Sequence, residues 1–389
     1  MKLEGVRVVD LSQFLPGPHL TMLMADQGAE VINVETPGAG EPTRSIGLKQ
    51  GGTSVYFRNT NRGKKSLSVN LKNDDGREAL LRLIETADVV LETFRPGVAE
   101  RLGIGYEAVK ARAPKVVYCS ISAFGQDSPM KDRPAHDLSV LALAGVASLT
   151  LGQDNKPAMP GSPPSDMSAS LMALSGILMA LLRAEKTGQG DYLDIAMQDC
   201  VMSWLPYTVG PVFAERRAPE PKMERLFGGA ALYGIYETRD GQWMTMGGSE
   251  AKFATNLLQG LGRPDLIPAA HDQPGPAQIP VVEFLRETFR SKDMAEWLAW
   301  FEGRDICYAP ILDLKTAFDQ PNVAARDMLL TDDHGNFHIG HPIKFRDEPA
   351  EVDLALADLG QDNAAIMRDI GYNDTEIAEL QESGALFRE

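Results

Sequence analysis

Short apolar segments alternate with helical segments over the first half of the chain. Residues 6–11 and 29–34 have the apolar, β-branched composition of strands, and residues 19–27 between them carry apolar side chains at helical spacing. The pattern continues with strand-like segments at 66–71, 89–92 and 116–121 and a helical segment at 75–86. Repeated β-α units build a parallel sheet with helices on its faces. The sequence therefore predicts an α/β domain.

The pattern changes after about residue 205. A strand at 192–197 and a helix at 198–205 end the first part, and a charged, Pro-containing segment follows. Residues 232–246 then predict a β-hairpin with an Asp-Gly turn, followed by helices at 252–261 and 294–302. A strand at 343–345 and a helix at 375–382 are expected in the tail. We predict a large α/β domain, a linker and a small α+β domain, at residues 1–205 (completed by 330–389), 206–224 and 225–325.

Composition narrows the possible partners. A net charge of −16 and a pI near 4.9 argue against binding to nucleic acid or to anionic membranes. The three cysteines are scattered and form no C-x-x-C pair, so we expect neither a disulfide nor a zinc site. Unpaired cysteines are typical of a reducing compartment, and we expect a cytoplasmic protein. The apolar stretch at 167–182 is shorter than the roughly 20 residues of a membrane span. It predicts a buried helix, and the N-terminus lacks a signal-peptide pattern.

Several common catalytic motifs are missing. No G-x-G-x-x-G follows the first strand, and there is no phosphate-binding P-loop and no G-x-S-x-G. His334, His338 and His341 lie near two aspartates, which would suit a metal. They also lie in a Gly- and Asp-rich stretch typical of a solvated loop, and we expect no metal site.

Three residues could carry chemistry. Asp166 stands at the head of an apolar helix, either as a helix cap or as a carboxylate that acts as nucleophile or general base. His136 lies in a loop, where a histidine is either a polar surface residue or an acid-base group. Glu250 follows Gly-Gly-Ser, where a glutamate either stabilises the N-terminus of a helix or belongs to a catalytic site. Basic residues between 58 and 72 form either a solvated face or a site for a polyphosphate.

Taken together, these segments resemble the family III CoA-transferases, which include the α-methylacyl-CoA racemases. The resemblance runs from about residue 3 to about 330 and becomes weaker beyond. The segments that carry it are short, and their order and spacing are specific: Leu3–Asp10, Pro16–Pro18, Gly28–Ile32, Asn61–Ser66, Phe94–Val98, Arg101–Gly103, Thr187–Gly190 and Ala309–Ile311.

The resemblance implies a fold and a ligand. It implies an interlocked homodimer with a large Rossmann-like domain that binds CoA, and an acyl-CoA as substrate with no cofactor beyond CoA itself. Segments that border CoA in relatives carry basic residues suited to its phosphates, namely Arg62, Lys72, Arg95 and Arg101.

The resemblance also leaves two chemistries open. In the transferases, the residue matching Asp166 attacks the thioester and forms a mixed anhydride, then an aspartyl-CoA thioester. In the racemases it exchanges a proton with the α-carbon, and a His and Glu pair serves the opposite face. His136 and Glu250 match the racemases, and Leu15 stands where well-known transferases carry a functional Gln. Met167-Ser168 and Val140 depart from the racemase pattern.

We therefore expect an enzyme that racemises or epimerises the α-carbon of a 2-methylacyl-CoA. His136, oriented by Glu250 of the partner chain, would serve one face, and Asp166 would serve the other. Backbone N–H groups at the start of the Asp166 helix are expected to stabilise the enolate oxygen. An acyl-CoA:carboxylate CoA-transferase is the first alternative, and a non-catalytic CoA-binding protein is the second.

Overall fold

The computed structural model describes residues 1–152 and 154–387. The chain forms two compact units. The first contains residues 1–147, 159–204 and 321–389, and the second contains residues 148–158 and 205–320. The second unit thus includes residues 206–224, which the sequence pattern suggested as a linker, and a short excursion before Asp166.

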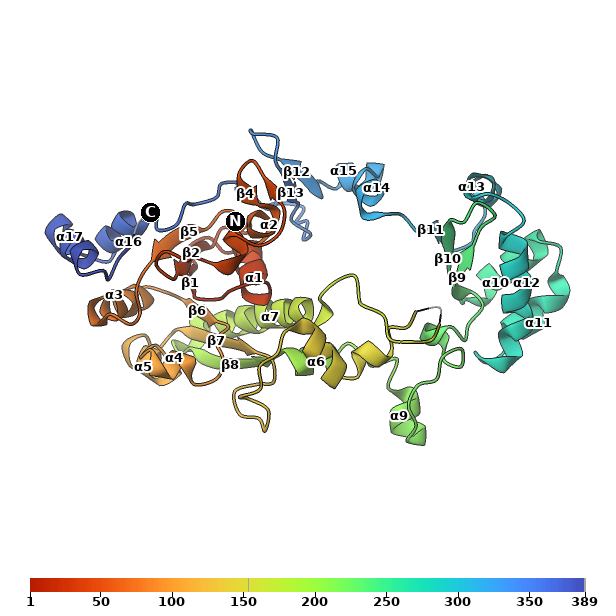
Figure 1. The fold of residues 1–389 in the computed structure, drawn as a ribbon, viewed down its shortest axis with the longest axis horizontal. Coiled ribbons are helices and arrows are strands. Elements are labelled where there is room, and N and C mark those ends of the chain that lie inside the picture. The colour runs from red at the N-terminus through yellow and green to blue at the C-terminus, as the bar shows by residue number, and fades with distance from the viewer. Residues whose placement is uncertain (153, 388–389) are drawn as a thin grey trace. The chain divides into compact units, whose positions relative to one another are not determined.

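A six-stranded parallel sheet forms the centre of the first unit (Figure 1). Its strands, in spatial order, are β5 (Lys65–Ser68), β2 (Glu30–Glu35), β1 (Arg7–Asp10), β6 (Val89–Glu92), β7 (Val117–Ser122) and β8 (Asp191–Ala196). The sheet grows outward in both directions from β1, which is the doubly wound order of Rossmann-like folds. The predicted parallel α/β architecture is confirmed.

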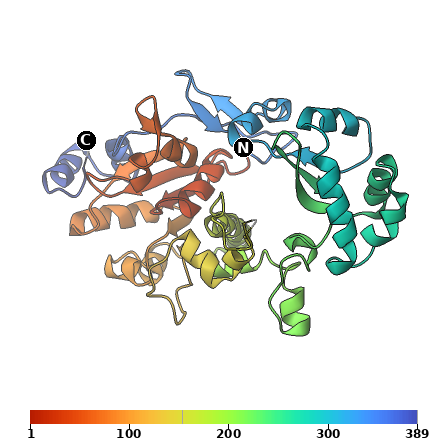
Figure 2. The same cartoon turned by 45° about the vertical axis from the view of Figure 1, so that its right-hand side comes forward.

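Helices cover both faces of this sheet. Val8 and Val9 point to opposite faces, because side chains alternate along a strand. The Val8 face is covered by α1 (Pro16–Ala25), α6 (Asp137–Leu143), α7 (Pro164–Thr187) and α8 (Met197–Met202). The Val9 face is covered by α3 (Asp74–Ile84), α5 (Tyr106–Arg112), α16 (Asn363–Asp369) and α17 (Asp374–Glu382). The two C-terminal helices, deep blue in Figure 2, thus complete a core begun by the N-terminal strands.

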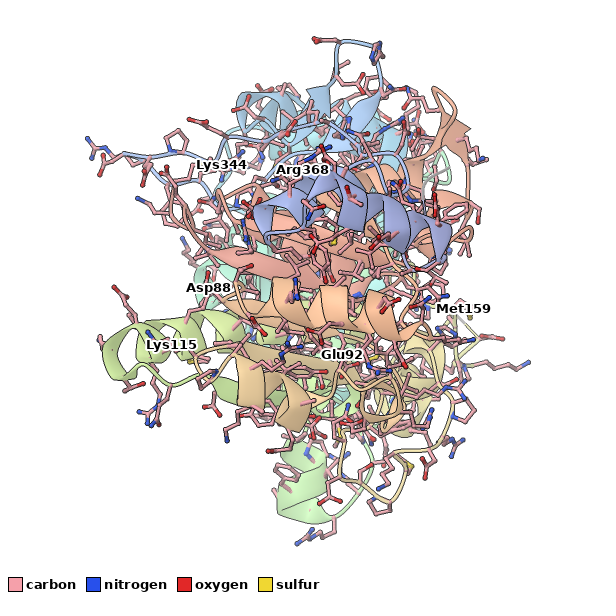
Figure 3. The ribbon with its side chains drawn as sticks, turned by 90° about the vertical axis from the view of Figure 1, so that its left-hand side faces the viewer. Asp88, Glu92, Lys115, Met159, Lys344 and Arg368 are labelled. Atoms are coloured by element: carbon pink, nitrogen blue, oxygen red, sulfur yellow. The ribbon has the colours of Figure 1, made fainter. Side chains whose placement is uncertain are left out.

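All six strands end at the same edge of the sheet. In Figure 3, Asp88 and Lys115 mark the amino ends of β6 and β7, and Glu92 marks the carboxyl end of β6. Met159, seven residues before Asp166, lies on the side opposite Asp88 and Lys115. Because α1 and α7 each follow a strand and run back along it, their N-termini lie at the carboxyl edge.

Helix α7 is long and apolar enough to cross a membrane when only its length and composition are considered. It connects β7 to β8, however, and Ala169, Ala173 and Ile177 are completely buried in the core beside the sheet. These contacts identify α7 as the crossover helix of a β-α-β unit.

Short elements complete the first unit. They are α2 (Val55–Asn61), α4 (Val98–Arg101), α15 (Pro321–Ala325), the hairpin β3 (Lys49–Gln50) with β4 (Thr53–Ser54), and the hairpin β12 (Leu329–Thr331) with β13 (Phe337–Ile339). The strand expected at 343–345 is wrong, because that segment has no ladder partner and its side chains are exposed. In the histidine-containing hairpin, the carboxylate of Asp332 accepts the backbone N–H groups of His334 and Asn336. Residues 1–152 and 154–387 contain no group of three or more His, Cys, Asp and Glu side chains placed to hold a metal ion.

The second unit is an α+β unit around a three-stranded antiparallel sheet. Its strands are β9 (Tyr233–Glu237), β10 (Trp243–Gly247) and β11 (Tyr308–Pro310), with β10 in the middle. The predicted hairpin is confirmed, with β9 and β10 paired through the Asp-Gly turn. Its helices are α9 (Gly210–Glu215), α10 (Ala251–Gly260), α11 (Ile267–Ala270), α12 (Ile279–Phe289), α13 (Met294–Phe301) and α14 (Leu314–Phe318). Trp297, Phe289 and Phe301 form an aromatic core.

Candidate functional site

The strand order reverses between β1 and β6, and doubly wound sheets bind ligands at such a point, outside the carboxyl ends of the strands. The loops that follow these two strands are joined there, because the backbone N–H of Gln13 donates to the hydroxyl of Thr93 at 3.0 Å. The N-termini of α1 and α7 lie at the same edge. The fold therefore indicates a ligand site at this position of the first unit.

Asp166 lies in the first turn of α7, half-buried, and its carboxylate has no hydrogen-bond partner in the described parts of the chain. Burial and the neighbouring Asp137 raise the pKa of Asp166 to about 7. The helix N-terminus favours the anion, but desolvation outweighs this effect. A carboxyl group with this pKa can both accept and donate a proton near neutral pH.

Asp137, rather than Asp166, caps helix α7. One carboxylate oxygen of Asp137 accepts the N–H of Ser165 at 2.8 Å, the hydroxyl of Ser165 at 2.5 Å and the N–H of Asp166 at 3.2 Å. The helix begins after Pro163, which places Asp166 three residues inside. The interpretation of Asp166 as a cap is therefore wrong. Asp137 thereby links the start of α6, where His136 is the N-cap residue, to the first turn of α7.

The same contacts correct another expectation. Backbone N–H groups at the start of α7 were expected to stabilise an enolate oxygen. The N–H groups of Ser165 and Asp166 instead donate to Asp137, and Pro164 has none. The first turn of α7 therefore has no free donor at these positions.

His136 is the N-cap residue that precedes helix α6, and its side chain is exposed. The imidazole of His136 and the ring of Phe14 form a T-shaped, edge-to-face contact, with ring centroids 5.9 Å apart and an interplanar angle of 85°. Phe14 has a φ of 66°, a strained value for a side chain of this size. The N–H of Phe14 donates to the buried carboxylate of Glu41 at 2.8 Å, which holds this conformation. Phe14 was not singled out from the sequence, because a lone phenylalanine in a loop carries no signal.

Further polar groups lie on the same unit as Asp166. Burial and the charge of Asp166 raise the pKa of Tyr56. One helical turn after Asp166, the hydroxyl of Ser170 lies 2.8 Å from Nδ1 of His19. Burial and the charges of Lys64 and Arg62 lower the pKa of His19 to about 4. His19 is therefore neutral at physiological pH and does not supply a charge to the site.

Glu250 lies on the second unit, where it precedes α10. It is exposed, and no side chain or backbone donor in residues 1–152 and 154–387 bonds to its carboxylate. This leaves the carboxylate available to a group outside its own unit. Its pairing with His136 of a partner chain remains a proposal.

Three of the four basic residues expected near CoA are exposed. Lys72 follows β5, and Arg95 and Arg101 follow β6. None of these three cations forms an ion pair within the described part of the chain. All three follow the carboxyl ends of strands of the same parallel sheet, β5 and β6, and this edge suits the phosphates of a nucleotide.

Arg62 serves the fold instead. Its side chain is completely buried, and its guanidinium donates to Asp26 at 3.1 and 2.7 Å and to the carbonyl of Ile339 at 2.7 Å. His341 also contacts Asp26, at 3.1 Å. With its guanidinium engaged and no exposed surface, Arg62 does not offer a phosphate contact, and we remove it from the expected CoA-binding set.

Replacing Arg62 by Met should therefore affect stability rather than ligand binding. The change leaves the buried carboxylate of Asp26 without its guanidinium partner, and we expect a loss of about 3–5 kcal/mol in the free energy of unfolding. The control is Arg368→Met at a residue labelled in Figure 3. It removes an exposed ion pair with Asp374 and should cost less than about 1 kcal/mol. Urea unfolding measures both. Equal effects of the two substitutions would contradict the structural role of Arg62.

Comparisons with known proteins agree with this fold and site. The family model of CoA-transferase family III matches residues 3–363. The chain is 32% identical over 402 residues to succinyl-CoA:glutarate CoA-transferase of Mus musculus, and the alignment covers 99% of this chain and 90% of the relative. The chain is also 31% identical over 388 residues to α-methylacyl-CoA racemase of the same organism, and that alignment covers 98% of this chain and 96% of the racemase.

A solved structure is also similar. A CaiB/BaiF family protein from Brucella suis superimposes with a TM-score of 0.82 at 29% identity and covers 95% of this chain and 99% of that one. The chain belongs to CoA-transferase family III. Members of this family include both transferases and a racemase, so membership defines a CoA-thioester enzyme and leaves its reaction open.

Proposed function

We propose that the protein racemises or epimerises the α-carbon of a 2-methylacyl-CoA by two-base proton transfer. Asp166 exchanges a proton with one face of the α-carbon, and His136 exchanges a proton with the other. The bond to the α-hydrogen breaks as one group takes the proton, and the electron pair moves into the thioester carbonyl to form an enolate. The opposite group then returns a proton to the α-carbon.

One observation carries this proposal. Through the carboxylate of Asp137, the His136–Asp137 pair is attached to the first turn of α7, beside a carboxyl group whose pKa is raised to about 7. Proton transfer is fastest when the pKa of the acid-base group lies near the working pH. Two titratable groups at one edge of the sheet, neither engaged in an ion pair within the described residues, suit that reaction.

Residue identities support the same reaction. Glu250 and His136 occupy the positions of the pair that serves one face of the α-carbon in the racemases that the sequence resembles. Leu15 occupies the place where transferases carry a functional Gln, and its side chain lacks an amide. We further propose an interlocked homodimer in which Glu250 of the partner chain orients His136. CoA would lie at the carboxyl edge of the sheet near Lys72, Arg95 and Arg101.

The second candidate is CoA transfer to a carboxylic acid. It is favoured by a specific observation, since succinyl-CoA:glutarate CoA-transferase is a relative along nearly the whole chain. In that reaction Asp166 attacks the thioester carbonyl, CoA leaves as the thiolate, and an acyl-aspartyl anhydride forms. CoA thiolate then attacks the carbonyl carbon of Asp166, which releases the acyl carboxylate. The aspartyl-CoA thioester finally passes CoA to the acceptor.

The two reactions differ in what they require. A panel of 2-methylacyl-CoA thioesters is incubated in D₂O, once without an acceptor and once with free carboxylic acids. Deuterium at the α-carbon without an acceptor supports racemisation. If no deuterium appears and a new acyl-CoA forms only when an acceptor acid is present, racemisation is rejected and CoA transfer is supported. CoA binding without turnover of any thioester would point to a non-catalytic protein.

The pH dependence should also separate the reactions. Two-base racemisation needs one proton shared between Asp166 and His136, so kcat/KM should fall when both groups are protonated and when both are deprotonated. We expect a bell-shaped profile with one limb near pH 7, because burial raises the pKa of Asp166 to about 7. A nucleophilic Asp166 needs only to be ionised, so a single limb that rises with pH would contradict racemisation.

A further inference from the structure

The loop between β1 and α1 contains a strained residue to which the proposed reaction gives no role. Phe14 has a φ of 66°, in the left-handed region that residues other than glycine seldom adopt. Its side chain remains 37% exposed, so burial of the ring in the core does not account for the strain. Strained residues persist only where their surroundings enforce them, and they are concentrated at functional sites. The contacts of Phe14 therefore point to its role.

The backbone of this loop is fixed just before Phe14. The N–H of Ser12 donates to the buried carboxylate of Asp10 at 3.0 Å, and the N–H of Gln13 donates to the hydroxyl of Thr93 at 3.0 Å. Asp10 is the last residue of β1, and Thr93 directly follows β6. The two strands between which the strand order reverses therefore both hold the loop, which makes it a rigid support for Phe14.

Glu41 fixes the backbone of Phe14 itself. The N–H of Phe14 donates to Oε1 of Glu41 at 2.8 Å. This carboxylate is buried, and its other oxygen accepts the N–H of Thr43 at 2.8 Å. The N–H of Glu41 donates in turn to buried Glu35 at 2.8 Å, whose carboxylate is paired with Arg44 at 2.7 Å. Because Glu41 is anchored through its backbone and both carboxylate oxygens, it can hold Phe14 in a conformation that costs free energy.

The ring held in this way meets a residue of the proposed reaction. The ring centroid of Phe14 lies 5.9 Å from that of the His136 imidazole, in the T-shaped geometry that aromatic pairs favour. The imidazole is otherwise exposed and forms no hydrogen bond within residues 1–152 and 154–387. Both residues belong to the first unit. Within that unit, the ring of Phe14 thus supplies the aromatic contact that can fix the orientation of the imidazole.

Resting on the proposed function, we infer that Phe14 is a positioning residue for racemisation. Its ring, which Glu41 holds through a strained backbone, fixes the plane of the His136 imidazole, so that a ring nitrogen is aimed at one face of the α-carbon. Proton transfer depends strongly on such alignment, since a displacement of about 1 Å can cost about 10²-fold in rate. Asp166 serves the other face. Loss of the Phe14 ring should therefore affect the two faces unequally.

The test follows each epimer of a 2-methylacyl-CoA separately in D₂O. The variants Asp166→Asn and His136→Ala first identify which epimer loses its α-hydrogen to which residue. Phe14→Gly should then lower hydrogen exchange at the epimer that depends on His136 by about 10- to 10²-fold, and inversion should fall with it. Exchange at the epimer that depends on Asp166 should be retained. Calorimetric titration should show an unchanged affinity for the acyl-CoA.

Stability measurements separate positioning from a purely structural role. Glycine adopts a φ of 66° without strain, so the midpoint of urea unfolding of Phe14→Gly should not fall, although hydrogen exchange does. Phe14→Leu removes the ring but keeps the backbone strain, and it should show the same loss of exchange. Phe14→Tyr retains an aromatic ring and should exchange at the wild-type rate. The matched control is Phe345→Leu, at a phenylalanine that is 40% exposed, and it should leave hydrogen exchange unchanged.

The orientation of the imidazole is also measurable without any reaction. In protein labelled with ¹³C-histidine, the resonances of His136 are identified by their loss in His136→Ala. NMR relaxation of its ring C–H bonds should report greater motion in Phe14→Gly and Phe14→Leu than in the wild type or Phe345→Leu.

Three results would overturn the inference: unchanged motion of the His136 ring, an equal loss of exchange at both epimers, or a loss of acyl-CoA affinity, which would assign Phe14 to substrate binding. If the wild type racemises and Phe14→Gly keeps both exchange rates, the inference fails alone. If the wild type shows no α-deuterium, the proposed racemisation fails, and the motion of the His136 ring still shows whether Phe14 holds the imidazole.

Discussion

Replacing Asp166 by Asn should lower kcat/KM by about 10²- to 10⁴-fold, the range expected for loss of an acid-base group. The amide occupies nearly the same volume but neither accepts nor donates the proton at the α-carbon. Because the Asp166 carboxylate has no hydrogen-bond partner among the described residues, no structural contact is lost with it. The loss should therefore appear in turnover while CoA affinity stays unchanged.

The same substitution should stabilise the protein at high pH. The pKa of Asp166 is raised from 3.8 to about 7 by burial and by Asp137, so the folded state holds this proton more tightly than the unfolded state. Ionisation of Asp166 therefore lowers the free energy of unfolding. This destabilisation is absent below pH 3.8, grows as the pH rises and is complete above about pH 7. Asp166→Asn removes this destabilisation, and urea unfolding at pH 8 should show a larger free energy of unfolding than in the wild type.

The control is Asp191→Asn, at an exposed position. It should change neither activity nor the dependence of stability on pH. Wild-type turnover in Asp166→Asn, or a loss of stability at pH 8, would contradict the role given to the carboxylate.

Replacing His136 by Ala should lower the rate of racemisation by about 10²- to 10⁴-fold. One face of the α-carbon then has no proton donor or acceptor. Because the imidazole is exposed and is not hydrogen-bonded to a described residue, the free energy of unfolding should change by less than about 0.5 kcal/mol. Acyl transfer through Asp166, if the enzyme has it, should persist in this variant.

His334→Ala provides the matched control, since His334 is also exposed but lies in the turn between β12 and β13. It should leave the rate of racemisation unchanged. Substantial racemisation by His136→Ala, measured with separated epimers, would contradict the two-base assignment.

The periodic part of the fold was predictable from the sequence. Val8 and Val9 alternate between two cores, and apolar residues of α3 recur at helical spacing, because each element buries one face. The strand expected at 343–345 failed for the opposite reason. The three residues of this segment, with exposed Lys344 in the middle, bury little surface, and no local signal specifies a partner strand.

The site was predictable only as a set of residue types. Asp166 and His136 were found because their positions match known relatives. The bond from the N–H of Asp166 to Asp137, the neighbour of His136, spans 29 residues of sequence and depends on the fold. Arg62 shows the converse. An arginine has the same appearance in a sequence whether it faces a phosphate or a buried aspartate, and only the fold brings Asp26 to it.

The central claim is proton transfer at the α-carbon, and inversion of that carbon tests it most directly. A single epimer of a 2-methylacyl-CoA is incubated with enzyme in D₂O without an acceptor acid, and early samples are separated by chiral chromatography before mass spectrometry. The account predicts that the inverted epimer appears, carries deuterium at the α-carbon and reaches the same final mixture from either starting epimer. An α-carbon that keeps its hydrogen and its configuration, while CoA passes to an added carboxylic acid, would contradict the account and assign Asp166 as a nucleophile.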